Sequence, residues 1–110
     1  MLEALWSVEF VSNTGVFGAG VVVFETGRLF GGDSQYYYVG NYQVKDSKVS
    51  ATISVNHYSG APNSVFGARE RFSIVVSGDI EDRVMEIYGH LEEEPEMEIA
   101  IRLTRRAELP

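Results

Sequence analysis

The side chains that could support catalysis or metal binding are few and lie far apart in the sequence. The chain has two histidines, His57 and His90, and no cysteine. A metal site needs at least three convergent ligands, and no His-x-His spacing brings two of them together. Cysteine nucleophiles, disulfides and cysteine-based zinc sites are excluded, and no G-x-S-x-G elbow or P-loop motif is present. We therefore expect a protein that is not an enzyme, with no catalytic residue, metal or cofactor.

Two local features resemble functional motifs but have simpler interpretations. Gly31-Gly32-Asp33 is glycine-rich like a phosphate-binding loop, yet no lysine or helical pattern follows it. Paired glycines admit positive φ, so this segment predicts a tight turn. His57 falls on the apolar face of an expected strand, which favours a hydrogen-bonded core histidine over a ligand-binding or catalytic one.

Charge argues against nucleic acid as a direct partner. Nine Lys and Arg residues against 16 Asp and Glu residues give a net charge of −7, which repels phosphate backbones. The longest apolar stretch, residues 16–24, is nine residues long and too short to cross a bilayer as a helix. The first six residues contain no basic region and no long apolar run. We expect a soluble, cytoplasmic protein that does not contact membranes.

Negative charge is concentrated in one segment. Residues 79–98 hold nine acidic residues and one basic residue, Arg83, and the density is highest around an expected turn at residues 92–96. The segment is either a solvated hairpin or a docking surface for a basic partner, such as a DNA-binding protein whose phosphate-contacting face it covers. The second interpretation makes five residues candidates for partner binding: Glu92, Glu93, Glu94, Glu96 and Glu98.

Positioning these residues requires β-structure, because apolar and polar residues alternate with a period of two along most of the chain. The clearest case is residues 49–58, where Val49, Ala51, Ile53, Val55 and His57 share one face. Turn residues separate the alternating segments. Eight strands are expected, at residues 6–11, 18–24, 28–30, 36–44, 49–58, 71–77, 84–91 and 97–103.

Eight short strands at regular spacing predict an all-β protein with little or no helix. We expect a single domain, residues 1–110, folded as an eight-stranded antiparallel up-and-down barrel, because closure removes exposed edges. A sandwich is the alternative, since alternation alone does not separate the two. Residues 59–67 form the longest irregular stretch and could hold one short helical turn or a lid.

An eight-stranded barrel is either filled by its own side chains or holds one small ligand. Gly40, Ala51 and Gly89 are expected to point inward, where they would thin the packing. Large aromatic and polar-aromatic side chains would then form the wall of a cavity for a small apolar ligand. The alternative is that they are simply core residues. The candidates are Trp6, Phe10, Tyr38, Tyr42, His57 and Phe72.

Short motifs follow one another in a fixed order over residues 6–67. They are Trp6-Ser7-Val8-Glu9-Phe10-Val11-Ser12-Asn13, Gly18-x-Gly20-Val21, Gly27-x-x-x-Gly31-Gly32-Asp33, Tyr38-x-Gly40-x-Tyr42, and His57-Tyr58 leading into Pro62-x-Ser64-Val65. In this order and spacing the chain resembles the GrlR family, negative regulators of type III secretion gene expression in Gram-negative bacteria.

The resemblance implies a small barrel similar to the calycins (lipocalin-like) and a homodimer. It also implies a regulatory role without catalysis, in which the protein sequesters a basic helix-turn-helix transcriptional activator. In founding members of the family that contact uses an exposed Glu-Asp-Glu-Asp loop between the strands that match residues 38–44 and 49–58.

This chain departs from the family at that loop. The corresponding turn reads Lys45-Asp46-Ser47-Lys48. Asp46 is the only acid in this turn, and the turn contains two bases, Lys45 and Lys48. We therefore hypothesise that a docking surface for a basic activator would lie mainly at Glu92–Glu98, with Asp46 as a further candidate. The alternative function is that of a small apolar-ligand carrier or sensor, and the two functions are compatible.

Overall fold

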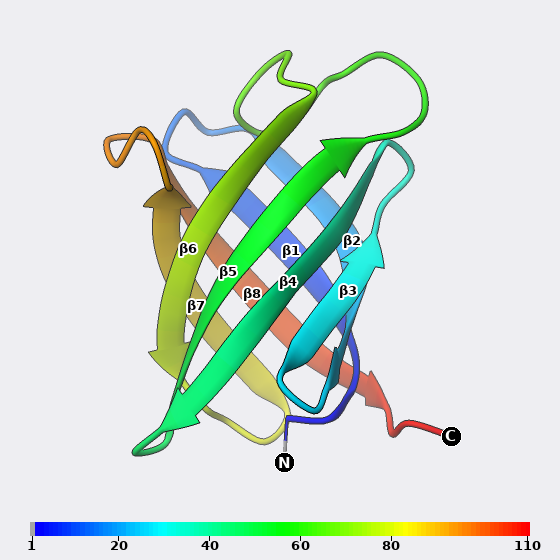
Figure 1. Ribbon diagram of the computed structural model, residues 1–110, viewed down its shortest axis with the longest axis vertical. Coiled ribbons are helices and arrows are strands. Elements are labelled where there is room, and N and C mark those ends of the chain that lie inside the picture. Colours follow the sequence, from blue (N-terminus) through cyan, green and yellow to red (C-terminus); the bar gives the residue numbers. More distant parts are fainter. Residues whose placement is uncertain (1) are drawn as a thin grey trace.

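The alternation of apolar and polar residues produces eight strands and no helix within residues 2–110, the part of the chain that the computed structural model describes. The strands are β1 (Ala4–Ser12), β2 (Phe17–Glu25), β3 (Arg28–Gly32), β4 (Tyr36–Lys45), β5 (Lys48–His57), β6 (Arg71–Asp79), β7 (Val84–Leu91) and β8 (Glu98–Ala107) (Figure 1). Among these residues no helix could cross a membrane.

Each strand pairs antiparallel with its neighbour in the chain, and β8 pairs back onto β1 to close the barrel. The closing pairs run from Leu5↔Ala107 to Ser12↔Ile99, with a register shift between Leu5 and Trp6. The predicted up-and-down barrel is confirmed, and the sandwich alternative is wrong. Closure explains the choice, because it gives the outer edges of β1 and β8 a backbone partner.

Two of the tight turns have backbone angles that match the twist of a hairpin. Thr26 and Gly27 between β2 and β3 both have positive φ, at 50° and 79°. Asp46 and Ser47 between β4 and β5 have φ values of 53° and 65°. Positive φ at both central residues is the type I′ arrangement, which suits the right-handed twist of the flanking strands.

The alternation of apolar and polar residues also determines which side chains point into the barrel. In β5, Val49, Ala51, Ile53 and Val55 are buried, as the sequence predicts. The core takes such inward residues from every strand and adds Val65 and Phe66 from the β5–β6 connection.

The structure differs from the sequence-based expectation in two segments. Gly31 and Gly32 were expected in a turn but belong to β3, where they pair with Val22 and Val21 of β2. Residues 58–70 contain no helical turn, but Val65 and Phe66 from this connection are each only 6% exposed. This connection therefore folds against the barrel as a cover.

The two ends of the barrel are built differently (Figure 1). The upper end in that view carries the β1–β2, β3–β4, β5–β6 and β7–β8 connections. The lower end carries the three remaining connections and both termini. Near the lower end Trp6 is fully buried, and its Nε1 donates a hydrogen bond to the Leu2 carbonyl at 2.9 Å.

Candidate ligand cavity

The barrel interior is not completely filled. A cavity of about 300 Å³ runs through it, and all eight strands contribute side chains to its lining. The wall is mostly aliphatic, with Ile53, Ile74, Ile87 and Ile101 among its residues. Four residues of the lining are exposed: Phe17, Ala19, Ser34 and Asn63. They lie in connections at the upper end or in the first turn-proximal residues of β2, so the cavity opens there.

The small residues of the interior have different roles. Ala51 lines the cavity, so its short side chain leaves space that a larger one would occupy. Gly40 and Gly89 do not line it: a Cβ atom would lie 2.2 Å from the Thr52 carbonyl oxygen at Gly40 and 1.8 Å from the Val75 carbonyl oxygen at Gly89. The expectation that these two glycines thin the packing is therefore corrected, because they allow close approach of neighbouring strands.

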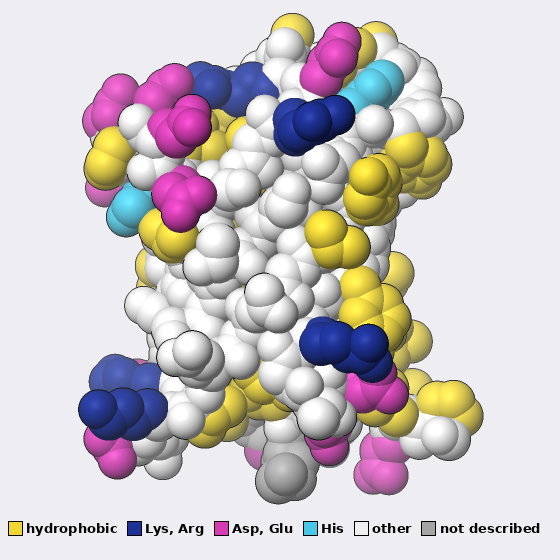
Figure 2. Space-filling model, in the orientation of Figure 1, with side chains coloured by type: hydrophobic (Ala, Val, Ile, Leu, Met, Phe, Trp, Pro, Cys, Tyr) yellow, Lys and Arg dark blue, Asp and Glu magenta, His cyan; other side chains and the backbone are white. Residues whose placement is uncertain are grey.

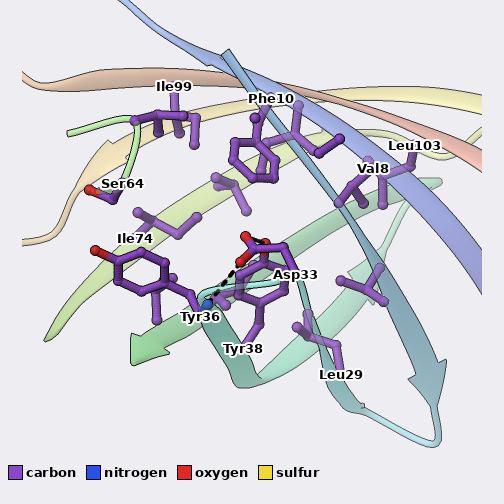
Figure 3. Close-up of a pocket in the computed structure, with 18 of the residues that line it drawn as sticks. Val8, Phe10, Leu29, Asp33, Tyr36, Tyr38, Ser64, Ile74, Ile99 and Leu103 are labelled. Carbon is purple, nitrogen blue, oxygen red and sulfur yellow. Dashed lines mark hydrogen bonds between the residues drawn. The ribbon is translucent and has the colours of Figure 1, made fainter. Parts of the chain in front are cut away.

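Three of the six candidate residues lie in the cavity wall: Phe10, Tyr38 and Phe72. The rings of Phe10 and Tyr38 meet edge to face, with centroids 6.4 Å apart. Phe10 packs closely over Gly18, where a Cβ atom would come within 2.3 Å of the ring. Figure 3 shows these two rings on facing walls of the cavity.

The other three candidates lie outside the lining. The rings of Trp6 and Phe24 pack edge to face, with centroids 6.2 Å apart. The centroid of the Tyr42 ring lies 5.0 Å from that of the same Phe24 ring. His57 is half-buried at the upper rim rather than in the core, with Nε2 at 2.6 Å from the Gly60 carbonyl oxygen. Alternation identifies the inward face of a strand but not the height along it, which explains the difference.

Asp33 lines the cavity, whereas the sequence pattern predicts only that it lies in a turn. Its Oδ1 accepts hydrogen bonds from the backbone N–H groups of Gln35 and Tyr36, both at 2.8 Å, and its Oδ2 accepts one from the Tyr38 hydroxyl. Figure 3 shows the carboxylate beside the Tyr38 ring and inside the cavity. An Asp whose side chain accepts from the backbone N–H groups two and three residues later is a known turn signal. It could have identified the cap but not the cavity.

Two tyrosines near Asp33 stay in the hydroxyl form. Burial raises the pKa of Tyr38 far above its usual range, and donation to the Asp33 carboxylate raises it further. Burial also raises the pKa of Tyr36, whose hydroxyl donates to the Arg69 carbonyl at 2.6 Å. Tyr36 thus ties the cavity wall to the β5–β6 connection.

The five candidate glutamates lie on or beside the β7–β8 connection, but they are not equivalent. Glu94 is half-buried, and its carboxylate forms two hydrogen bonds with the Arg69 guanidinium, at 3.0 and 3.3 Å. Glu92, Glu93, Glu96 and Glu98 are exposed. Figure 2 shows acidic side chains gathered over this connection, with basic ones beside them.

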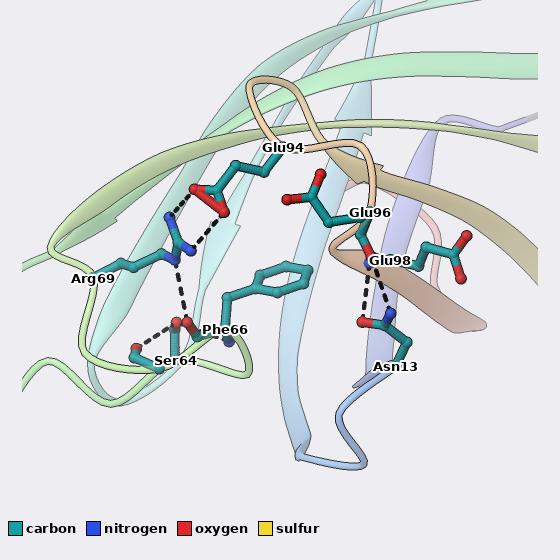
Figure 4. A network of polar contacts seen from close by, with 8 residues as sticks. Asn13, Ser64, Phe66, Arg69, Glu94, Glu96 and Glu98 are labelled. Atoms are coloured by element: carbon teal, nitrogen blue, oxygen red, sulfur yellow. Dashed lines mark hydrogen bonds and ion pairs between the residues drawn. The ribbon is translucent and has the colours of Figure 1, made fainter.

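The backbone of this connection is fixed by polar contacts. Asn13 Nδ2 donates to the Glu96 carbonyl at 3.0 Å, and Asn13 Oδ1 accepts from the Glu98 N–H at 3.1 Å (Figure 4). Asn13 holds the acidic connection against the β1–β2 turn at the upper end. Asp46 lies in the β4–β5 turn at the lower end, so the structure separates it from the five glutamates.

Within residues 2–110, no three His, Cys, Asp or Glu side chains come close enough together to hold a metal ion. The chemistry of the site therefore rests on an apolar wall, aromatic rings, two tyrosine hydroxyls and the Asp33 carboxylate.

Comparison with known proteins bears on the fold. No model of a known protein family and no curated protein matches the chain. Among solved structures, a redesigned β-barrel is similar, with a TM-score of 0.51 and 10% sequence identity over 96% of this chain and 91% of that one. This likeness shows the β-barrel fold.

Proposed function

We propose that this protein is a non-enzymatic β-barrel that binds a small, mainly apolar molecule in its interior. The observation that carries the proposal is the cavity of about 300 Å³, which is lined by all eight strands and opens at the upper end. Ligand sites are typically concave and apolar with a few placed polar groups. The cavity volume lies at the lower limit of the range for small-molecule sites. It equals the volume of roughly ten water molecules in the liquid, so the ligand would have about that many non-hydrogen atoms.

The experiment that tests this function is a titration with a fluorescent apolar probe, followed by displacement with 1-octanol. Wild-type protein is expected to bind the probe saturably, with an affinity that hardly changes with salt, because burial of apolar surface is not screened by ions.

Ala51→Leu supplies the decisive variant, since a leucine at this position would project into the cavity. We expect it to fold and to weaken octanol binding at least tenfold, as filling removes the space the ligand needs. Ala107→Leu is the matched control, because Ala107 is exposed near the end of β8. Equal binding by wild type and Ala51→Leu would contradict a cavity site.

The second candidate function is sequestration of a basic helix-turn-helix activator by a homodimer of this protein, in the manner that the resemblance to the GrlR family implies. The supporting observation is that Glu92, Glu93, Glu96 and Glu98 are exposed on one backbone segment that Asn13 holds in place. A fixed array of like charges steers a basic partner toward itself.

Its test is replacement of these four glutamates by glutamine, with Glu94 left to pair with Arg69. A basic DNA-binding protein that co-purifies at low salt is expected to be lost from the variant and from wild type at higher ionic strength. Asp46→Asn is the control at the other end of the barrel. Retention of the partner by the quadruple variant would exclude this surface.

A further inference from the structure

The cavity contains one charged side chain. Asp33 is the only Asp, Glu, Lys, Arg or His among the described residues that line it. The remaining polar side chains of the lining are neutral hydroxyls and amides. One negative charge thus faces a space with a mostly aliphatic and aromatic wall.

This carboxylate is held in place, and none of the ion pairs formed among the described residues includes it. Two backbone N–H groups and the Tyr38 hydroxyl fix its orientation. The ion pairs formed by residues 2–110 use other acids, namely Glu25, Asp79, Glu86 and Glu94. A carboxylate partly withdrawn from water is best satisfied by a positive charge, because neutral donors replace only part of its lost hydration.

Aromatic rings line the same cavity. The ring centroids of Phe10 and Tyr38 are 6.4 Å apart, and those of Tyr36 and Phe72 are 6.2 Å apart. All four side chains line the cavity. Ring faces attract cations, and aromatic clusters are a common means of binding ammonium groups. The carboxylate and the aromatic part of the cavity wall therefore favour the same kind of group.

We propose that the ligand is a small apolar amine, bound with its protonated nitrogen at Asp33 Oδ2 and its apolar body between the strands. This inference rests on the proposed ligand-binding function and specifies its ligand class. An amine of about ten non-hydrogen atoms matches the volume. A fatty acid is disfavoured, because its carboxylate would face Asp33 in a chain with a net charge of −7.

The experiment compares three probes of equal chain length: octylamine, 1-octanol and octanoate. Calorimetry at neutral pH is expected to show octylamine binding roughly tenfold more tightly than octanol, the usual gain from a charge-assisted hydrogen bond, with octanoate weakest. Equal affinity of octylamine and octanol would overturn the amine proposal but leave the ligand-binding function intact. Absence of saturable binding by all three would overturn both.

The variant Asp33→Asn tests whether the preference for octylamine over 1-octanol comes from the Asp33 side chain. The amide oxygen can still cap the Gln35 and Tyr36 N–H groups, while the negative charge is removed. The variant is expected to bind octylamine and octanol equally. Asp46→Asn changes the net charge by the same amount at the lower end and should keep the tenfold preference, which separates contact at Asp33 from general attraction. A preference that survives in Asp33→Asn would overturn the assignment.

A measurement on the wild-type protein covers the case in which Asp33→Asn does not fold. The ¹³C resonance of the Asp33 carboxyl is expected to shift on saturation with octylamine and to stay in place with octanol. An unmoved resonance under saturating octylamine would overturn the proposal.

Discussion

At the scale of single residues, the cavity wall contains an acid that caps a turn, Asp33, and a phenol that donates to it, Tyr38. Asp33 joins the β3–β4 turn to the wall of the cavity, because its two oxygens accept from both the turn backbone and Tyr38. The Gly-Gly-Asp sequence predicts a turn, and of its three residues only Asp33 lies in one, because the two glycines belong to β3. It does not predict that β4 returns Tyr38 beside the acid, since that depends on strand register.

The raised pKa of Tyr38 gives a prediction about alkaline stability. A group with a pKa that is higher in the folded state stabilises the fold fully below the unfolded pKa, near 10, and loses that contribution as pH rises above it. Tyr38→Phe is expected to reduce the fall in unfolding free energy between about pH 9 and 11. In the Tyr38→Phe variant, part of the decrease in unfolding free energy should remain, because burial also raises the pKa of Tyr36.

Urea denaturation at a series of pH values measures this effect. Tyr37→Phe is the matched control, because Tyr37 is 45% exposed on the outer face of the same strand. This control should keep the wild-type pH dependence. Identical pH dependence in wild type and Tyr38→Phe would contradict the role assigned to burial of the phenol.

At the scale of elements, strand alternation made most of the barrel predictable. The inward faces of β5, β6 and β8 follow from the sequence, because a period of two fixes the face of every residue in a strand. The long β5–β6 connection was less predictable. Its fold depends on contacts between distant segments, such as Tyr36 with Arg69 and Arg69 with Glu94.

The Arg69–Glu94 pair is expected to order this connection more than it stabilises the barrel. Both side chains are partly exposed, at 34% and 41%, and pairs of this kind contribute about 1 kcal/mol or less. Arg69→Met should therefore change global stability by less than about 1 kcal/mol. It should accelerate amide hydrogen exchange at Phe66, whose N–H donates to Ser64 Oγ within the connection.

Lys48→Met is the control for this prediction, because it removes an exposed pair with Asp79 at the lower end. Exchange at Phe66 should not change in that variant. A loss of several kcal/mol in Arg69→Met, or unchanged exchange at Phe66, would show that the pair has a different role.

At the scale of the whole molecule, the cavity mouth and the acidic connection lie at the same end of the barrel, and both termini lie at the other (Figure 1). Three of the six residues predicted for a cavity wall lie in it, and Trp6, Tyr42 and His57 do not. The sequence indicated the right faces but not how far the cavity extends, because that depends on how the closed barrel packs. The pairing of Glu94 with Arg69 was equally hidden, since 25 residues separate the two.

Binding of a small apolar molecule in the barrel interior is the function we propose for this protein. A two-dimensional NMR titration with 1-octanol tests it most directly, because it reports where binding occurs. We expect saturable shifts at cavity residues such as Ala51, Ile74 and Ile87, and none at the β4–β5 turn. Shifts that are absent, or confined to exposed side chains on the outside of the barrel, would contradict it.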